Sequence, residues 1–204
     1  MNHNVRNVEE LYLSSKSLYD DGIMNGDNSA DGILKNLNDG INNLKINWKG
    51  VDAGVKIQEV VTVYNAMVIV RNSLLDLVYK ASSIASNYRK IQNANGGRLT
   101  ELQILTADAQ SIADDYFDNA DTIDINPDAA IGRNFIDQAR NSLDTFETNV
   151  RSKYEDIMGN WRAGTGRAET QNAFEHYMSD IKKYKEKLLS VSQSVSTALG
   201  NYDF

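Results

Sequence analysis

The chain has 204 residues, 41% of them hydrophobic and 24% charged, which is enough for a globular protein with a buried core. It contains no cysteine, which excludes disulfides, thiolate nucleophiles and thiolate metal sites. Its net charge of −7 disfavours nucleic acid as a partner, and its single proline, Pro127, favours long helices over a turn-rich β-sandwich.

The N-terminal segment, residues 1–10, is polar and shows no apolar stretch after basic residues, so it does not resemble a signal peptide. The most apolar run, residues 60–70, is too short to cross a bilayer and is interrupted by Thr62 and Asn65. We therefore expect synthesis in the cytoplasm and no transmembrane segment. If the protein is secreted, we expect an export route that does not read a standard signal peptide.

Residues 1–95 predict two helices joined by a turn at Gly50 and Gly54. Apolar side chains recur every three or four residues in both helices, which is the period of an amphipathic helix. Several glycines weaken the first helix and predict a break near residues 22–28. The apolar positions are Leu11, Leu18, Ile33, Leu37, Ile41 and Leu44, then Ile57, Val60, Tyr64, Met67, Leu74, Val78, Ala81, Ala85 and Tyr88.

Residues 96–123 predict a connector with a short helix of its own. Gly96 and Gly97 indicate a turn at its start. Apolar and small residues then follow at spacings that favour a helix, and an acidic stretch, residues 114–128, leads into the next part. The residues of this predicted helix are Leu99, Leu102, Leu105, Ala109, Ile112 and Tyr116.

Residues 124–204 predict a second pair of helices. Asn126 is a typical helix cap and Pro127 suits a first helical position. Glycines at 159, 164 and 166 indicate the turn. The first stripe comprises Ile136, Ala139, Leu143, Phe146, Val150, Tyr154 and Ile157. The second, a heptad seam, comprises Phe174, Tyr177, Ile181, Tyr184, Leu188, Val191, Val195, Ala198 and Tyr202.

The two halves form an internal repeat when the chain is displaced by 113 residues, as from Trp48 to Trp161. The displacement superposes the only two tryptophans and keeps the apolar register on both sides of them. The other matching pairs include Lys49/Arg162, Tyr64/Tyr177, Leu75/Leu188, Leu37/Val150, Leu44/Ile157, Val68/Ile181 and Val78/Val191.

A helix, a turn carrying Trp-x-Gly and a second long helix resemble the WXG, or ESAT-like, family. Trp48-Lys49-Gly50 matches the motif, and Trp161-Arg162-Ala163-Gly164 matches it with one residue inserted before the glycine. The resemblance covers nearly the whole chain except the connector. It implies antiparallel hairpins that pair into a four-helix bundle and export by a type VII secretion system, as a substrate or as an adaptor for a larger substrate.

The resemblance makes Trp48, Lys49, Gly50, Trp161, Arg162 and Gly164 the candidate site residues. Their tryptophans either staple the two turns or present an aromatic surface to the secretion machinery or to a larger secreted effector. The family's Tyr-x-x-x-Asp/Glu export signal is missing, because no tyrosine here has an acid four residues on. This leaves a second interpretation, a cytosolic chaperone or targeting partner for a larger type VII toxin.

Motifs of catalysis or metal binding are weak in this sequence. Residues 27–32 fit the first half of a calcium loop, but Lys35 and Asn38 occupy its ninth and twelfth positions, where ligand oxygens are needed. His176 has no second histidine nearby on its helix. We therefore expect no enzymatic activity, cofactor or metal.

The predicted fold is all-α, with two antiparallel helical hairpins fused into a four-helix bundle and a short connector helix. Each amphipathic hairpin needs a second apolar layer, which the other hairpin supplies. The two hairpins can meet within one chain or in a domain-swapped homodimer, and the sequence leaves both open.

Overall fold

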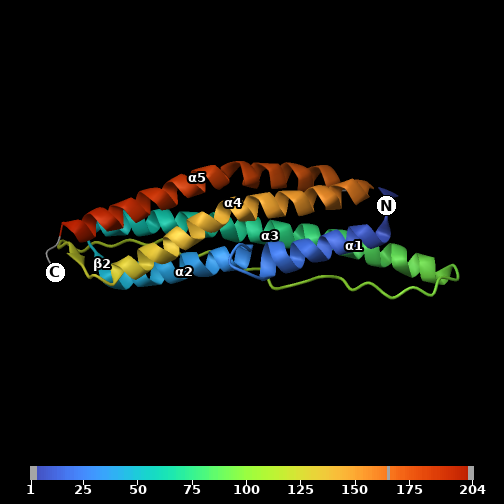
Figure 1. Cartoon of the computed structure of the whole chain (residues 1–204), viewed down its shortest axis with the longest axis horizontal. Helices are drawn as coiled ribbons and strands as arrows, with labels where there is room; N and C mark the ends of the chain where they lie inside the picture. Colours follow the sequence, from blue (N-terminus) through green and yellow to red (C-terminus); the bar gives the residue numbers. More distant parts are fainter. Residues whose placement is uncertain (1–3, 165, 202–204) are drawn as a thin grey trace.

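The computed structural model describes residues 4–164 and 166–201, which form an elongated, mainly helical bundle (Figure 1). The predicted all-α class is confirmed, because the only strands among these residues are two or three residues long. The elements are β1 (Asn4–Val5), α1 (Val8–Ser17), η1 (Leu18–Met24, a π-helix), α2 (Ala30–Asn47), β2 (Trp48–Lys49), α3 (Val51–Ala94), β3 (Asp124–Ile125), α4 (Ala129–Asn160), β4 (Trp161–Ala163) and α5 (Arg167–Gly200).

The long helices lie side by side, and α3 and α4 each pack against α1, α2 and α5. The chain reverses direction at β2 and again at β4, and these two reversals lie at opposite ends of the molecule (Figure 1). The apolar stripes form the core between the helices, as their period predicts. The buried stripe residues of α4 are Ile136, Ala139, Leu143, Phe146, Val150, Tyr154 and Ile157, and those of α5 include Phe174, Ile181, Leu188, Val191 and Val195.

Two glycines allow α2 and α4 to approach closely. A Cβ atom on Gly40 would lie 2.6 Å from Ile136 Cδ1 and 3.2 Å from the Gly132 carbonyl oxygen. The Gly132 N–H donates to Asn43 Oδ1 at 3.0 Å, so a polar bond also joins the helices where no side chain separates them. This contact ties the first half of the chain to the second.

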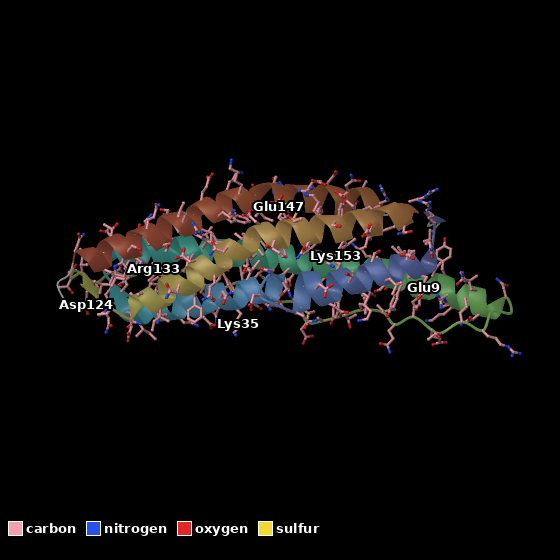
Figure 2. The ribbon with its side chains drawn as sticks, in the orientation of Figure 1. Glu9, Lys35, Asp124, Arg133, Glu147 and Lys153 are labelled. Atoms are coloured by element: carbon pink, nitrogen blue, oxygen red, sulfur yellow. The ribbon has the colours of Figure 1, made fainter. Side chains whose placement is uncertain are left out.

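The predicted break in the first helix is confirmed. The π-helix η1 ends at Met24, and α2 starts at Ala30 with the Ser29 side chain accepting a hydrogen bond from the Gly32 N–H. Lys153 of α4 donates to Ser17 Oγ at 2.7 Å and to Asp21 Oδ2 at 3.1 Å (Figure 2). The hydrogen bond from Lys153 holds the pKa of Asp21 below its usual value.

The predicted connector helix is wrong. Residues 98–120 form no helix and instead run along α3, from its C-terminal end back toward β2 (Figure 1). Polar side chains of α3 bind backbone groups of this segment that a helix would have paired internally. Partly buried residues recur mainly every three positions, which is the period of an extended, polyproline-like chain. They include Leu102, Leu105, Gln110, Ala113 and Tyr116.

The second half begins close to the predicted boundary. Asn126 Oδ1 accepts a hydrogen bond from the Asp128 N–H at 2.9 Å in the turn that precedes α4, but the predicted cap is wrong, because Asp128 holds the N-cap position. Regular α-helix starts at Ala129, two residues after Pro127, because residues 127–128 form a turn.

Helix α3 has the length and apolar composition of a membrane span, although the apolar run recognised in the sequence is shorter. Half of its most apolar 18-residue window is buried inside the protein. A core helix of a soluble protein has the same composition, so this property does not indicate a membrane segment.

Candidate functional site

The first elbow, residues Trp48 to Gly50, lies between α2 and α3. Trp48 ends α2, donating its backbone N–H to the Leu44 carbonyl, and its side chain is only 3% exposed. Trp48 pairs with the buried Ile125 of β3, and Lys49 pairs with Asp124. The Lys49 ammonium donates to the Lys45 carbonyl at the end of α2, where a positive charge complements the helix dipole.

Gly50 closes the first elbow with a backbone conformation that favours glycine and with a hydrogen bond to the connector. Its φ angle is +115°, which an L side chain rarely adopts, and it caps the N-terminus of α3. Its N–H donates to Asp118 Oδ2 at 2.9 Å, while the Ala120 N–H donates to Asp118 Oδ1 at 3.0 Å. The bond from Gly50, then that from Ala120 and the charge of Lys49, hold the pKa of Asp118 below its usual value.

The second elbow, residues Trp161 to Gly164, lies between α4 and α5. The Trp161 side chain is 1% exposed, and its residue pairs with Val5 of β1. The ladder is irregular here, with the three residues of β4 opposite the two of β1. The residue inserted into the second Trp-x-Gly motif is thus accommodated as a bulge in a short strand.

Arg167, the first residue of α5, closes the second elbow. Its Nε donates to the Trp161 carbonyl at 2.7 Å, and its Nη2 lies 3.4 Å from the Met158 carbonyl. These carbonyls lie at the C-terminal end of α4, where helix carbonyls lack intrahelical partners and a cation is favoured. Arg162, the predicted site residue, is exposed instead.

Each elbow is completed by the other half of the chain. β3, which pairs with the first elbow, immediately precedes α4, and β1, which pairs with the second elbow, immediately precedes α1. Two flanking bonds repeat this relation, from the Asn126 N–H to the Asn47 carbonyl at 2.8 Å and from the Arg6 N–H to the Asn160 carbonyl at 3.0 Å. The elbows are therefore reciprocal joints between the two halves.

Burial distinguishes the two interpretations of the tryptophans. Both tryptophans are almost fully buried, which favours the stapling role, and Trp48 also lines a hollow at the surface. The structure brings Trp48, Lys49 and Gly50 together at one end and Trp161, Arg162 and Gly164 at the other (Figure 1). It does not join the two sets into one site.

An exposed apolar surface lies beside the first elbow, and it was not predicted from the sequence. Val51, Val55 and Phe117 line one hollow, with 61%, 53% and 77% of their surfaces exposed. Val55 and Ile123, which is 58% exposed, line a neighbouring hollow with Trp48. Val51 and Val55 are four residues apart on one helix, but Phe117 and Ile123 belong to the connector. That these connector residues lie beside Val51 and Val55 could be predicted only from the extended path of the connector.

Within residues 4–164 and 166–201, no three histidine, aspartate or glutamate side chains gather in a way that could hold a metal ion. The half calcium loop is used structurally, because Ser29 caps α2 and Asp31 accepts a hydrogen bond from Arg71 Nε at 3.0 Å.

Comparisons with models of known families, with curated proteins and with solved structures find no match to this chain.

Proposed function

We propose that this chain is a non-enzymatic interaction protein of the tandem WXG type, in which two helical hairpins are fused into one four-helix bundle. In this proposal it is a secreted substrate or an adaptor of a type VII secretion system. The supporting observation is the reciprocity of the elbows, since each Trp-x-Gly turn is paired with the strand that enters the other half. Such pairing is what a fused pair of interlocking hairpins requires.

The surface beside the first elbow supports a docking role at this end of the bundle. Exposed, contiguous apolar side chains on a soluble protein are typical of interaction sites. Val51, Val55, Phe117 and Ile123 supply such side chains, while the buried Trp48 fixes the elbow beneath them. The partner in this proposal is a component of the secretion machinery or a larger secreted effector.

Export is tested in the native host by deleting the secretion ATPase of its type VII system. The proposal predicts that the protein disappears from the culture medium and accumulates in the cells. Undiminished export in the deletion strain would contradict it. A cytoplasmic protein without a secretion route, measured in the same medium, controls for cell lysis.

Docking at the first elbow is tested by replacing exposed side chains without touching the buried ring. Val51→Ser with Phe117→Ser should lower export or partner capture at least fivefold, while the melting temperature stays within about 2 °C of wild type, since surface substitutions change stability little. Leu13→Ser, at a residue of α1 that is 48% exposed, is the matched control. Equal export by both variants would assign the elbows a structural role alone.

A cytosolic chaperone for a larger toxin is the second candidate, and one observation favours it. A hollow of about 460 Å³ between α3 and α5 is lined by Leu74, Leu77, Phe174 and Met178, among others. Apolar hollows between helices are common binding sites for partner side chains. A pull-down from the host that yields a larger protein in equal amounts, together with retention of this chain in the cells, would favour this candidate over export.

A further inference from the structure

Three amide side chains spaced by seven residues on α3, which we name the amide ladder, hold the connector by its backbone. They are Gln58, Asn65 and Asn72. Asn65 donates to the Ala113 carbonyl at 3.0 Å and accepts from the Ala113 N–H at 2.7 Å. Asn72 repeats this arrangement with the carbonyl and N–H of Gln110, at 2.8 and 3.0 Å. Asn65 and Asn72 therefore each pair with both backbone groups of one residue, as a neighbouring β-strand would.

The helix and the connector keep the same register over three rungs. Gln58 accepts from the Tyr116 N–H, so steps of seven on the helix match steps of three on the connector. Seven helical residues rise about 10.5 Å. Three residues of an extended or polyproline-like chain rise about 9–10 Å. The two repeats nearly coincide, so an extended chain can bind successive rungs without bending.

Asn65 and Asn72 bind only the backbone of the connector and therefore demand little of the side chains at their rungs. Ile112, between two rungs, is 63% exposed, and Ser111 and Asp114 are also exposed. At the rungs, Gln110 and Ala113 are only partly buried. The third rung residue, Tyr116, is also partly buried, so the rungs accept an amide, a methyl group and an aromatic ring.

Charge adds a preference for an acidic segment. Gln58 Nε2 donates to the Asp115 carboxylate at 2.8 Å, whereas Arg71 reaches only the Asp108 backbone carbonyl, because its charge is paired with Asp31 at 3.0 Å. Further along, the Gly50 N–H binds the Asp118 carboxylate. A side-chain amide and a helix N-terminus thus bind two aspartates of the connector.

The second half shows that a helix of this kind is built without an amide ladder. Displaced by 113 residues, the rungs become Gln171, Met178 and Lys185, and among the described residues no connector lies there. Lys185 instead forms an ion pair with Asp144 of α4. The ladder is therefore not a requirement of helix packing, and its described side-chain hydrogen bonds run to the connector, apart from one that Asn72 accepts from Arg71 at 3.4 Å.

We propose that the amide ladder is a binding site for an extended polypeptide segment with carboxylates beside its last rung, where the connector has Asp115 and Asp118. The connector is its resident occupant, and a partner segment of the same pattern replaces it. The site depends on the backbone geometry of α3 and stands whether or not the chain is exported.

The test uses a fluorescein-labelled, end-blocked peptide of residues 104–116 as the probe. The host is the full chain with residues 104–116 replaced by a Gly/Ser sequence of equal length, which leaves the ladder unoccupied. We expect saturable binding to this host. We expect at least tenfold weaker binding to wild type, because a tethered segment competes at high effective concentration.

Matched variants separate the ladder from nonspecific binding. Asn65→Ala with Asn72→Ala in the same host removes four hydrogen bonds and should weaken binding at least tenfold. The peptide with Ala113→Pro lacks a rung N–H and should lose binding similarly, whereas Ser111→Pro should keep it, because the Ser111 N–H makes no described hydrogen bond. Binding that ignores these changes would overturn the proposal.

Folding of the host is checked by circular dichroism. If the Gly/Ser host loses its helices, the full chain carrying only Ala113→Pro in the connector takes its place, because this change weakens the resident strand and leaves α3 intact. No saturable binding to a helical host of either kind would also overturn the proposal.

Discussion

The two elbows bury the same residue type in the same relation to the other half, yet they are closed by opposite charges. At the first elbow a carboxylate, Asp118, accepts from Gly50 at the N-terminus of α3. At the second a guanidinium, Arg167, donates to carbonyls at the C-terminus of α4. Each charge complements the end of the helix dipole that it meets. The two elbows thus use side chains of opposite charge, according to whether a helix N-terminus or a helix C-terminus lacks hydrogen-bond partners.

The residue inserted before Gly164 accounts for part of this difference. In the first elbow Gly50 follows Lys49 directly and caps α3, so its N–H meets the connector. In the second, a bulge extends the strand and Gly166 caps α5, leaving Arg167 to turn back on α4. The motif therefore specifies the buried tryptophan and the reversal, and it leaves the closing contact to the neighbouring sequence.

Removing the indole ring of either tryptophan should lower the free energy of unfolding more than any other change, and by a similar amount at the two elbows. Trp48→Ala and Trp161→Ala each leave a cavity at a fully enclosed position and should cost about 3–5 kcal/mol of unfolding free energy. Chemical denaturation checks this. A loss below about 1 kcal/mol at one elbow only would show that the two joints are not comparable.

Substitutions where α2 and α4 approach closely test the packing of the two halves separately from the elbows. Gly40→Ala should destabilise the protein by about 1–3 kcal/mol, because the new methyl group overlaps Ile136 and approaches the Gly132 carbonyl. Gly159→Ala, in the last turn of α4 with open space around it, should be neutral or stabilising by up to about 1 kcal/mol. Thermal melting of both variants is the measurement, and destabilisation of equal size would contradict the described packing.

Arg167→Lys tests the closure of the second elbow alone. A lysine cannot donate to two carbonyls from one planar group, so the variant should lose about 1–2 kcal/mol. Arg162→Ala, which removes an exposed cation from the same elbow, should change stability by less than about 0.5 kcal/mol. Equal losses in urea denaturation would show that net charge, rather than the two bonds, stabilises the elbow.

Asp118→Asn tests the first elbow through pH and should have the smallest effect. The pKa of Asp118 is lowered in the folded protein, so its contribution is present above the unfolded value of about 3.9 and is lost as pH falls through the folded value. The melting temperatures of wild type and variant should therefore differ at pH 6–7 and converge below about pH 4. Asp121→Asn is the matched charge control, and a difference that grows with acidity would contradict the assignment.

The sequence predicts the helices well because their apolar periods are long and regular. The stripe from Ile136 to Ile157 is buried throughout, and the glycines near residue 22 correctly indicate the break before α2. The start of α4 is predicted to within two residues, although Asp128 and not Asn126 is its N-cap. In these segments local pattern and tertiary packing favour the same structure.

The connector could not be predicted in this way, because its structure depends on distant side chains. The spacing from Leu99 to Tyr116 satisfies a helical period, yet Asn65 and Asn72 bind the backbone in an extended form. The heptad spacing of the amides Gln58, Asn65 and Asn72 in α3 is a signal that could have indicated an extended partner. Asp118 is hidden among similarly spaced aspartates, and nothing local marks it as the partner of Gly50.

The reciprocity of the elbows within one chain is tested most directly by an engineered disulfide. Lys49 and Asp124 are cross-strand partners, so their Cα atoms lie within the range that a disulfide spans, and the chain has no cysteine to compete. Lys49→Cys with Asp124→Cys should form the bond under mild oxidation in a species of monomer mass. Arg162→Cys with Asp124→Cys should not form it, because β4 and β3 belong to the two different elbows. Cross-links of the first pair only between chains, or none at all, would contradict the account.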